Sequence, residues 1–597
     1  MFDREERITA VTPVLSELAF AVMNLALPDD RTRLHFDDVV SVSDWADSQW
    51  EMSSEISHLG IVSQRAHMGA TKSVPRDRLV LWGAFLADVA YFHQASFSAV
   101  SGQLAVASPG SPEVFELEVL FAGVAAMQNG EVASLSTKQR LRFRNLQSDS
   151  DPKWVIASWE SLEGERRLAS SFLFEEVLDR ALPDLSDRTR ARESIHERMA
   201  SEYLLDQEEV GRVAARPHKW FRMQAWDRHP GLAVVDLDRD GFDDLYVMAR
   251  WGPNQFLRNR GDGTFEEIAT QLEIDVVGHS SSAIFADFDN DGDADLFLGR
   301  TLERSRYFEN EDGRFRDRSQ PALEEGLPYL VSSVSAVDYD ADGLLDIYVS
   351  TYGNDVYQTV ANKVKPATYG VEALLNADFP FLPKRDLEIL WQRMRSPDWD
   401  GFLSIPGPRN VLLHNVGGGR FEWIQDTPLD VWRNTFQTSW SDYDDDGDPD
   451  AYVANDFAPD VLIRNEGGGR FSDASDEALT GEIGLAMGVS WGDYDRDGRQ
   501  DAYVTNMYSK AGSRITAALG HLEEGLREAA AGNYLFHNEG GRFERVSGHG
   551  PDELHVAKAG WGWGSIFADV DNDGFLDLHA LSGFYTAPRS VAASADT

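Results

Sequence analysis

Six stretches of this chain place aspartates at alternate positions ahead of a glycine, in the pattern D-x-D-x-D-G-x-x-D. The copies begin at Asp236, Asp287, Asp338, Asp442, Asp493 and Asp569. Alternate residues of a tight loop can point successive carboxylates inward, and Ca²⁺ is a hard cation that takes about six to eight oxygen ligands. The pattern therefore predicts six calcium loops, so the fold of this region must form the same tight turn six times.

Each position of the loop has its own predicted role. Positions one, three, five and nine supply carboxylates, and position seven, whose residue type varies freely, supplies its backbone carbonyl. Glycine at position six permits the positive φ of the sharp bend. The predicted metal ligands are Asp236, Asp238, Asp240, Phe242 and Asp244; Asp287, Asp289, Asp291, Asp293 and Asp295; Asp338, Asp340, Asp342, Leu344 and Asp346; Asp442, Asp444, Asp446, Asp448 and Asp450; Asp493, Asp495, Asp497, Arg499 and Asp501; and Asp569, Asp571, Asp573, Phe575 and Asp577.

The residues around the loops argue against an EF-hand. An EF-hand carries a bidentate Glu at position twelve and a helix on each side, whereas position twelve is apolar in all six copies. The flanks are short apolar segments, such as residues 283–286 before the second loop and 296–298 after it. We therefore predict that each loop joins two β-strands.

A second signature follows each of the first five loops, consisting of an apolar segment that ends in Asn, a glycine-containing turn and a Phe. It spans Asn254 to Phe265 and has counterparts at Arg306 to Phe315, Asn410 to Phe421, Val461 to Phe471 and Asn533 to Phe543. With both signatures, residues 213–585 resemble the FG-GAP and VCBS repeat families of integrin alpha subunits and ASPIC/UnbV-type repeat proteins, although no ASPIC/UnbV tail follows Tyr585. The resemblance implies a mainly β fold, a calcium-binding β-propeller, with a role in binding or cell adhesion.

The spacing of the loops predicts the blades and two insertions. Uninterrupted repeats are 51 residues long, which suits a four-stranded blade. The third and fifth repeats are longer by 54 and 22 residues between the loop and the closing Asn. These insertions, near residues 355–408 and 509–531, occupy the same connection and should emerge on one face of a propeller.

The repeats predict six blades, with seven as the alternative. The sixth repeat contains only the calcium hairpin, and we expect upstream residues around 218–226 to complete it. Closing the ring in this way would remove exposed sheet edges.

The amino-terminal part lacks the repeat and is predicted to be an α+β domain of residues 1–172. Residues 5–28 and 79–100 have the pattern of amphipathic helices, and three later segments alternate like antiparallel strands. This element order resembles the nuclear transport factor-like cone fold, whose members include dimerisation modules and small-molecule binders. Trp154 and Trp159 fall on opposite faces of the last predicted strand, so one of them should lie in the core.

The other predicted parts are a helical connector at 173–212, the propeller at 213–590 and a tail at 591–597.

The amino-acid composition limits the classes of binding partner and the cellular compartments that we predict for this protein. The net charge is −45, and six bound Ca²⁺ ions would leave about −33, which argues against nucleic acid because its binding requires basic residues. The absence of cysteine excludes disulfides and thiolate metal sites. Loops of this kind work at roughly 10⁻⁴ to 10⁻³ M calcium, which favours an extracellular, periplasmic or cell-surface location, although the first residues are not a clear signal peptide. We predict no transmembrane span, since no apolar run is long enough.

Two functions from different classes remain open. The leading prediction is a non-enzymatic, calcium-stabilised scaffold that presents its insertion-bearing face to a protein or carbohydrate, with aromatic residues of the insertions forming either a binding platform or the core of a structural cap. The alternative is a polysaccharide lyase or hydrolase with its site on the same face. Its candidate residues are Glu372, Arg385, Asp386, Glu388, Arg393, Arg514, His521, Glu523 and Glu524, but their spacing marks no reaction.

Four tryptophans on strands that lead into the loops are predicted to pack between blades, and they are Trp440, Trp491, Trp561 and Trp563.

Overall fold

The computed structural model of the protein divides into two compact units. The first unit is Met1–Glu176, and the second consists mainly of Val177–Ser513 and His521–Ala593. The described residues are 2–57, 59–104, 113–146, 153–172, 174–200, 202, 231–323, 326–353, 384–393, 406–478, 480, 484–508, 529, 531–548 and 553–582. Within these ranges no helix has both the length and the apolar character that a membrane span requires.

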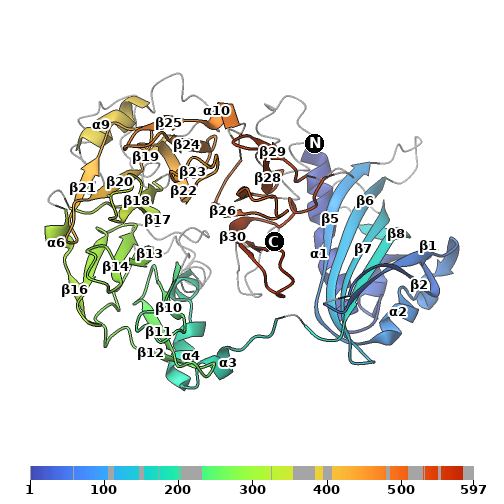
Figure 1. The fold of residues 1–597 in the computed structure, drawn as a ribbon. Coiled ribbons are helices and arrows are strands. Elements are labelled where there is room, and N and C mark those ends of the chain that lie inside the picture. The colour runs from blue at the N-terminus through green and yellow to red at the C-terminus, as the bar shows by residue number, and fades with distance from the viewer. Residues whose placement is uncertain are drawn as a thin grey trace. The chain divides into compact units, whose positions relative to one another are not determined.

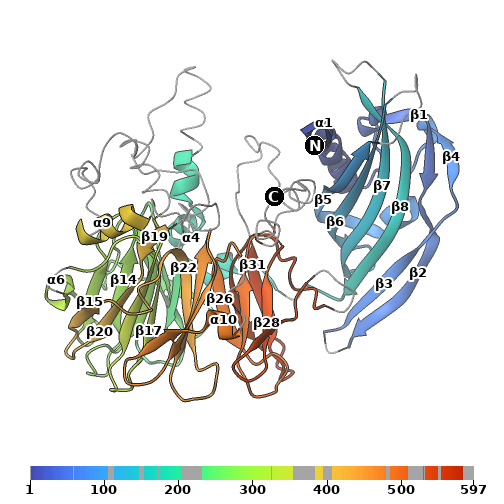
Figure 2. The ribbon, with the colours of Figure 1, turned by 90° about the horizontal axis from the view of Figure 1, so that it is seen from above.

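The first unit is an eight-stranded sheet with a long helix packed against it (Figures 1 and 2). Its strand order is β2-β3-β8-β7-β6-β5, and β1 joins β8 and β4. The elements are α1 (Phe2–Met23), β1 (Phe36–Ser43), β2 (Trp45–Ile56), β3 (Ile61–Met68), β4 (Lys72–Pro75), α2 (Gly83–Asp88), β5 (Val89–Leu104), β6 (Val114–Met127), β7 (Val132–Asn145) and β8 (Trp154–Ala169). Buried α1 residues such as Val11 and Leu15 share one hydrophobic core with Phe121 and Trp159 of the sheet.

The predicted helix at residues 79–100 is wrong. Only α2 is helical there, and β5 pairs with β6 along its length. Three register shifts interrupt this pairing, and each shift moves the inward-facing position by one residue. The buried residues Val89 and Phe92 consequently lie three positions apart, a spacing that imitates the period of a helix.

The same mechanism overturns the prediction that only one of Trp154 and Trp159 lies in the core. Both side chains are buried in the hydrophobic core of the first unit. The register of β7 and β8 skips Ala157, and this bulge between the two tryptophans brings both onto the same face. The resemblance to a nuclear transport factor-like cone fold stays a prediction.

The second unit begins with two short helices and continues as a series of antiparallel sheets. Asp184 caps the second helix by accepting the N–H of Ser186 at 2.8 Å. The helices are α3 (Leu178–Ala181), α4 (Leu185–Arg192), α6 (Ser319–Ala322), α9 (Lys384–Arg393) and α10 (Ser475–Ala478). The strands, grouped by sheet, are β9 (Leu232–Val235), β10 (Asp244–Val247), β11 (Gln255–Asn259) and β12 (Phe265–Glu267); β13 (Ser280–Ala286), β14 (Asp295–Arg300), β15 (Arg306–Asn310) and β16 (Phe315–Asp317); β17 (Val331–Val337), β18 (Asp346–Thr351), β20 (Val411–Asn415) and β21 (Phe421–Ile424); β19 (Pro406–Arg409), β22 (Trp432–Ser441), β23 (Asp450–Asp456), β24 (Val461–Asn465) and β25 (Phe471–Asp473); β26 (Gly488–Gly492), β27 (Asp501–Thr505), β28 (Tyr534–Asn538) and β29 (Phe543–Arg545); and β30 (Gly562–Ala568) with β31 (Asp577–Ser582).

These sheets form a propeller-like arrangement around a common centre (Figure 1). The first strands of successive sheets, from β9 through β13, β17, β22 and β26 to β30, lie next to one another. Hydrophobic clusters fill the space between adjacent sheets, as where Phe285 contacts Tyr246 at a ring-centroid distance of 5.6 Å. The number of blades stays a prediction, because the residues expected to complete the sixth lie outside the described ranges.

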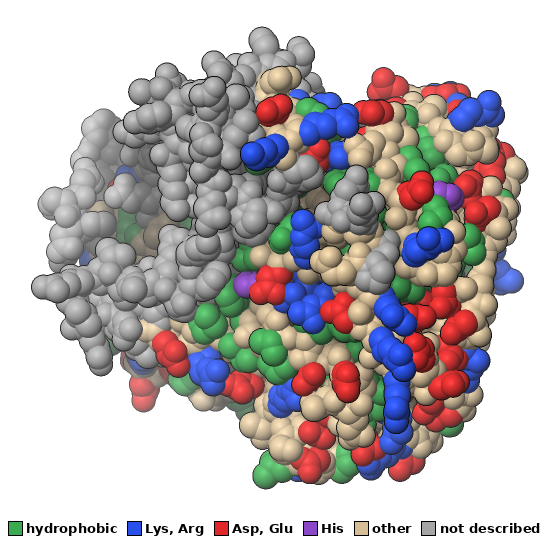
Figure 3. All heavy atoms as spheres, turned by 90° about the vertical axis from the view of Figure 1, so that its left-hand side faces the viewer, with side chains coloured by type: hydrophobic (Ala, Val, Ile, Leu, Met, Phe, Trp, Pro, Cys, Tyr) green, Lys and Arg blue, Asp and Glu red, His purple; other side chains and the backbone are tan. Residues whose placement is uncertain are grey.

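The sheets follow the sequence repeats with one addition. The strand β19, which precedes β20 in the chain, pairs with β22 and gives the fourth sheet a fifth strand. On the face of the molecule in Figure 3, acidic and basic side chains are interspersed. The negative net charge is therefore not gathered into one patch in that view.

Candidate functional site

The predicted calcium loops close the hairpins between the first and second strands of the sheets, as expected. In the second sheet, for example, Ala286 pairs with Asp295, and the loop from Asp287 lies between them. The described strands flank all six loops in this way. The prediction that the loops join strands, rather than helices, is confirmed.

The six loops share one set of backbone hydrogen bonds. The aspartate at position one accepts the N–H of position five through one carboxylate oxygen and the N–H of Gly at position six through the other, at 2.9–3.1 Å. The aspartate at position five accepts the N–H of position seven at 2.8–3.0 Å. These bonds order the loop and leave each carboxylate oxygen a lone pair that can bind a cation.

Carboxylates from positions one, three and five converge. In the first three loops, one oxygen from each of these side chains lies within 4.8 Å of the others. These groups are Asp236, Asp238 and Asp240; Asp287, Asp289 and Asp291; and Asp338, Asp340 and Asp342. Such an all-oxygen donor set suits a hard divalent cation.

The aspartate at position nine has a second role that the sequence pattern did not indicate. In the second loop, Asp295 accepts the N–H of Phe288 at 3.2 Å and that of Asn310, the closing Asn, at 2.8 Å. The first five loops repeat this arrangement. The carboxylate therefore ties the loop to the third strand of its sheet.

Burial of these position-nine carboxylates favours their neutral form. It raises the pKa of Asp295 and Asp346 to about 6 and that of Asp450 to about 7, because burial removes water from the charged group. A cation within the loop would favour the charged form and lower these pKa values.

The backbone at position four is left-handed in every loop, which sequence reasoning missed. The glycines at position six have φ of 86–99°, as predicted, but the residues at position four also have φ of 57–65°. They are Arg239, Asn290, Ala341, Asp445, Arg496 and Asn572. Positive φ is uncommon outside glycine, and no shared residue type marked this position.

Side chains at position four connect neighbouring loops. Arg239 Nη2 lies 3.0 Å from Asp293 Oδ1 of the second loop, and Asn290 donates to the carbonyl of Gly343 of the third loop at 3.1 Å. The guanidinium of Arg496 lies 4.9 Å from the ring centroid of Phe575 in the sixth loop. The first loop therefore contacts the second, the second contacts the third, and the fifth contacts the sixth.

Two histidines lie beside the third and fifth loops and were also missed. His414 Nδ1 is 3.1 Å from Asp346 Oδ1, and His537 Nδ1 is 3.4 Å from both Asp495 Oδ2 and Asp501 Oδ1. Each histidine directly precedes the closing Asn of its repeat. The second signature of each repeat includes this position. Because the other repeats carry Arg or Glu there, the sequence did not indicate that the position belongs to the site.

The connections that carry the insertions lie at the opposite end of the strands from the predicted calcium loops. In the third sheet, Val337 pairs with Asp346 at the loop end, whereas Val331 pairs with Thr351 at the other end. The fifth sheet has the same order, with Thr505 paired to Gly488. The two insertions therefore leave their sheets at equivalent ends, as the repeat spacing predicted.

The helix α9, which belongs to the first insertion, is held by a buried ion pair. Arg409 Nε lies 3.0 Å from Asp386 Oδ2, and both side chains are at most 5% exposed. Arg409 Nη1 is also 3.4 Å from Asp430 Oδ1, and the guanidinium stacks 4.3 Å from the ring centroid of Trp423. The cluster of the buried Asp386 and Arg409 with the partly buried Asp430 and Trp423 is called the α9 anchor below.

The structure places few of the enzyme candidates together. Asp386 is part of the α9 anchor, and Arg393 lies over Trp432 at 5.2 Å. Arg385 pairs with Asp426 at 3.2 Å on the surface, and Glu388 is exposed. The remaining candidates, Glu372, Arg514, His521, Glu523 and Glu524, lie outside the described residues. The described candidates thus take part in packing or face solvent.

The tryptophans before the loops have two different environments. Trp440 donates to Ser335 Oγ of the neighbouring sheet at 3.0 Å, and Trp491 contacts Tyr452 and Phe543. These contacts confirm packing between sheets. Trp563 lines a cavity at the centre of the second unit, which Trp440 also reaches in addition to its contact with Ser335.

Comparison with known proteins identifies the repeats. Residues 236–298, 287–349 and 442–504 match the FG-GAP-like repeat. Similar curated proteins include cartilage acidic protein 1 of Xenopus tropicalis, 31% identical over 121 residues, and that of Homo sapiens, 29% identical over 134 residues. The alignments cover 20% and 22% of this chain and 19% and 20% of those proteins, so the chain spans about a fifth of their length.

Among solved structures, the sialidase of Trypanosoma rangeli is 8% identical in an alignment that covers 74% of this chain and 58% of the sialidase, with a TM-score of 0.20. That score is too low to support an argument about this protein. The repeat matches and the sheet-by-sheet repetition of the loops agree with each other. The second unit of this chain therefore contains three FG-GAP-like repeats, at residues 236–298, 287–349 and 442–504.

Proposed function

We propose that the second unit is a calcium-stabilised, six-bladed propeller that serves as a binding scaffold for a protein or carbohydrate outside the cytoplasm. The observation that carries the proposal is the repetition of one loop geometry six times, with carboxylates that converge within 4.8 Å in the first three loops and no basic residue shared by all six. Without a cation, these carboxylates would repel one another and oppose closure of the hairpin.

The proposed ligands are the carboxylates of positions one, three, five and nine and the carbonyl of position seven. This donor set contains only oxygen, as calcium prefers. The ion would neutralise the loop, while the chain's own backbone N–H groups hold the carboxylates in place.

The expected stabilisation is large when summed over the loops. With calcium at about 100 times its dissociation constant, one site contributes roughly 2.7 kcal/mol by mass action. Domains are typically stable by about 5–15 kcal/mol. Several sites together would therefore decide whether the second unit is folded.

The insertion-bearing face is the proposed partner surface. It lies opposite the calcium loops, and the α9 anchor fixes the described part of the first insertion against the sheets. An extracellular or cell-surface location is part of the proposal, because loops of this type suit calcium of roughly 10⁻⁴ to 10⁻³ M.

Calcium binding by the full chain, measured by isothermal titration calorimetry after exhaustive chelation, tests the first part of the proposal. We expect about six sites, and no measurable binding would contradict it. A glycan and protein array probed with and without calcium tests the second part. Partner binding that requires calcium supports a scaffold, while hydrolysis or cleavage of a bound glycan would show an enzyme instead.

A further inference from the structure

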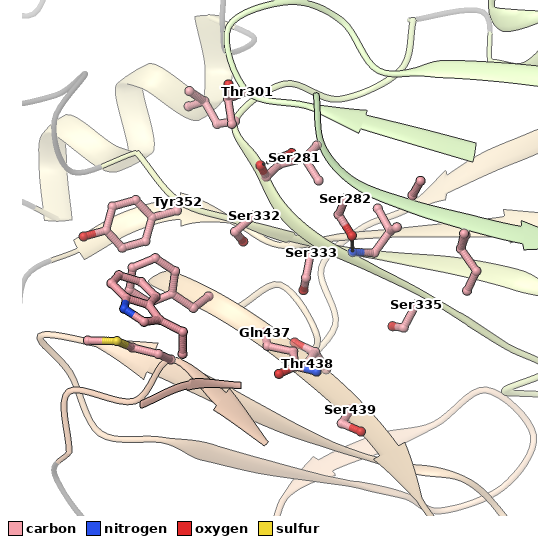
Figure 4. A pocket seen from close by; sticks show the side chains of 18 of the residues that line it. Ser281, Ser282, Thr301, Ser332, Ser333, Ser335, Tyr352, Gln437, Thr438 and Ser439 are labelled. Carbon is pink, nitrogen blue, oxygen red and sulfur yellow. Dashed lines mark hydrogen bonds between the residues drawn. The ribbon is translucent and has the colours of Figure 1, made fainter. Parts of the chain in front are cut away.

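A cavity of about 610 Å³ lies at the centre of the second unit, where the first strands of the sheets meet. This volume falls within the range of roughly 300–1,000 Å³ typical of small-molecule sites. The cavity is lined by residues in or next to the first strands of six sheets and is called the central cavity; its strand residues include Leu232, 281–284, 331–336, 436–440 and Trp563. Figure 4 shows the labelled serines, threonines, Gln437 and Tyr352 around this space.

One structurally equivalent position supplies a side chain to the cavity from each of five sheets. It is the sixth residue before the first Asp of each loop, and in four of the sheets it is the extra residue of a β-bulge. These residues are Ser281, Ser332, Phe436, Met487 and Trp563. Bulges redirect a side chain and are frequent beside binding sites.

The two serines use this position to join neighbouring sheets. Ser281 Oγ donates to the carbonyl of Val331 at 2.7 Å, and Ser332 Oγ donates to the carbonyl of Thr435 at 2.6 Å. Each of these hydroxyl groups already donates its proton to a backbone carbonyl. A ligand would therefore have to donate a hydrogen bond to a remaining lone pair of the serine oxygen. This wall of the cavity therefore suits a ligand that carries hydroxyl groups.

In the fourth sheet the equivalent residue is Phe436, which cannot form the bond to the next sheet. Its ring instead stacks on Tyr352, with centroids 4.4 Å apart and an interplanar angle of 23°, and meets Trp563 edge-on at 5.5 Å. Tyr352 is itself fixed, since its hydroxyl donates to the buried Asp456 at 2.8 Å. The result is an ordered aromatic surface in the same cavity as the two serines.

The described lining of the cavity carries little charge, which favours a neutral ligand. Arg250 is the one charged side chain among the described residues that line it, and the chain as a whole carries a net charge of −45. A sugar ring combines an apolar face of C–H groups with hydroxyls that donate hydrogen bonds. These two features match the aromatic surface and the serine wall.

We propose that the central cavity binds a neutral pyranose sugar, with its apolar face against Phe436 and Trp563 and its hydroxyls donating to Ser281 and Ser332. The proposal rests on the calcium-held scaffold proposed above and names the ligand class and the site. It places recognition inside the ring of sheets, at the end of the strands from which the insertions leave.

The test is titration of the calcium-loaded full chain with methyl α-glucopyranoside, methyl β-galactopyranoside and N-acetylglucosamine, followed by tryptophan fluorescence and calorimetry. At least one sugar should bind saturably. The substitutions Trp563→Ala and Phe436→Leu should each weaken it by about two- to tenfold, since one aromatic contact is worth about 0.5–1.5 kcal/mol. The matched control is Phe174→Leu, an exposed ring outside the loops and the cavity, which should leave the affinity unchanged.

Phe436→Leu is chosen because it preserves apolar volume, and the thermal midpoint of each variant confirms that it is folded. Absence of saturable binding by all three sugars, or equal affinity in the parent and both cavity variants, would overturn the proposal and leave a water-filled channel only. Melting of the same samples with calcium and with chelator separates the two ideas. A calcium-dependent midpoint without sugar binding refutes the sugar site alone, whereas a midpoint that ignores calcium refutes the scaffold.

Discussion

The two ends of the strands in the second unit differ in how much the residue type varies from repeat to repeat. At the loop end, all six repeats keep the same aspartates, the same glycine and the same backbone hydrogen bonds. At the other end, the equivalent bulge position changes from serine to phenylalanine, methionine and tryptophan around the central cavity. One end of each sheet therefore repeats the same loop structure, whereas the residue type at the other end differs from sheet to sheet.

The largest single-site effect is expected at the α9 anchor, on the variable side. Arg409→Ala leaves the buried Asp386 and the partly buried Asp430 without their cation, and breaking a buried pair such as Asp386 with Arg409 costs about 3–5 kcal/mol. Urea unfolding measures the loss. Arg385→Ala, which breaks only the surface pair with Asp426, should cost about 0–1 kcal/mol, and equal losses for the two variants would refute a structural role for the anchor.

A pH dependence is expected from Asp456, also on the variable side. Burial raises its pKa to about 7, so the folded state holds a proton that the unfolded chain releases near pH 4. Its contribution to stability is complete below about pH 4 and is lost as pH rises through 7, by up to about 4 kcal/mol. Asp456→Asn should therefore flatten the difference in unfolding free energy between pH 5 and 8. Identical pH profiles for the variant and the parent would contradict the raised pKa.

A smaller effect is expected from one calcium ligand on the uniform side. Asp289→Ala should lower stability by roughly 2.7 kcal/mol when calcium is at about 100 times its dissociation constant. In chelator the variant and the parent should unfold alike, because neither has an ion to lose. Unfolding of the entire second unit by this one change would show that the loops are not separate sites.

The smallest effect is expected at the contact between the first two loops. Arg239→Ala removes the exposed pair with Asp293 and should cost about 0–1 kcal/mol. If calcium titrations of this variant show a reduced cooperativity, then the contact couples neighbouring loops. An unchanged titration curve would assign it to local packing.

The hairpins of the second unit could be predicted from sequence because the geometry of each loop requires particular residue types at fixed positions. Alternate aspartates, the glycine and the apolar position twelve located the hairpins, and the spacing to the closing Asn located both insertions. The left-handed position four could not be predicted, since Arg239, Asn290 and Ala341 share no chemistry. Trp563 was expected to pack between blades, and only the bulge seen in the structure turns it toward the cavity.

The first unit was harder to predict because bulges hide the alternation on which strand recognition depends. In β5, register shifts gave the segment an apparent helical period. In β8, one extra residue brought Trp154 and Trp159 to the same face. Long paired strands decide these conformations through contacts distant in sequence, and local pattern does not contain that information.

The most direct test of the account is thermal unfolding of the full chain, followed by circular dichroism and calorimetry, in saturating Ca²⁺, in chelator and in Mg²⁺ at equal ionic strength. The account predicts that the transition of the second unit moves to a much higher temperature in Ca²⁺ than in either other condition, while that of the first unit does not move. A second-unit midpoint that is the same in Ca²⁺ and in chelator would contradict it.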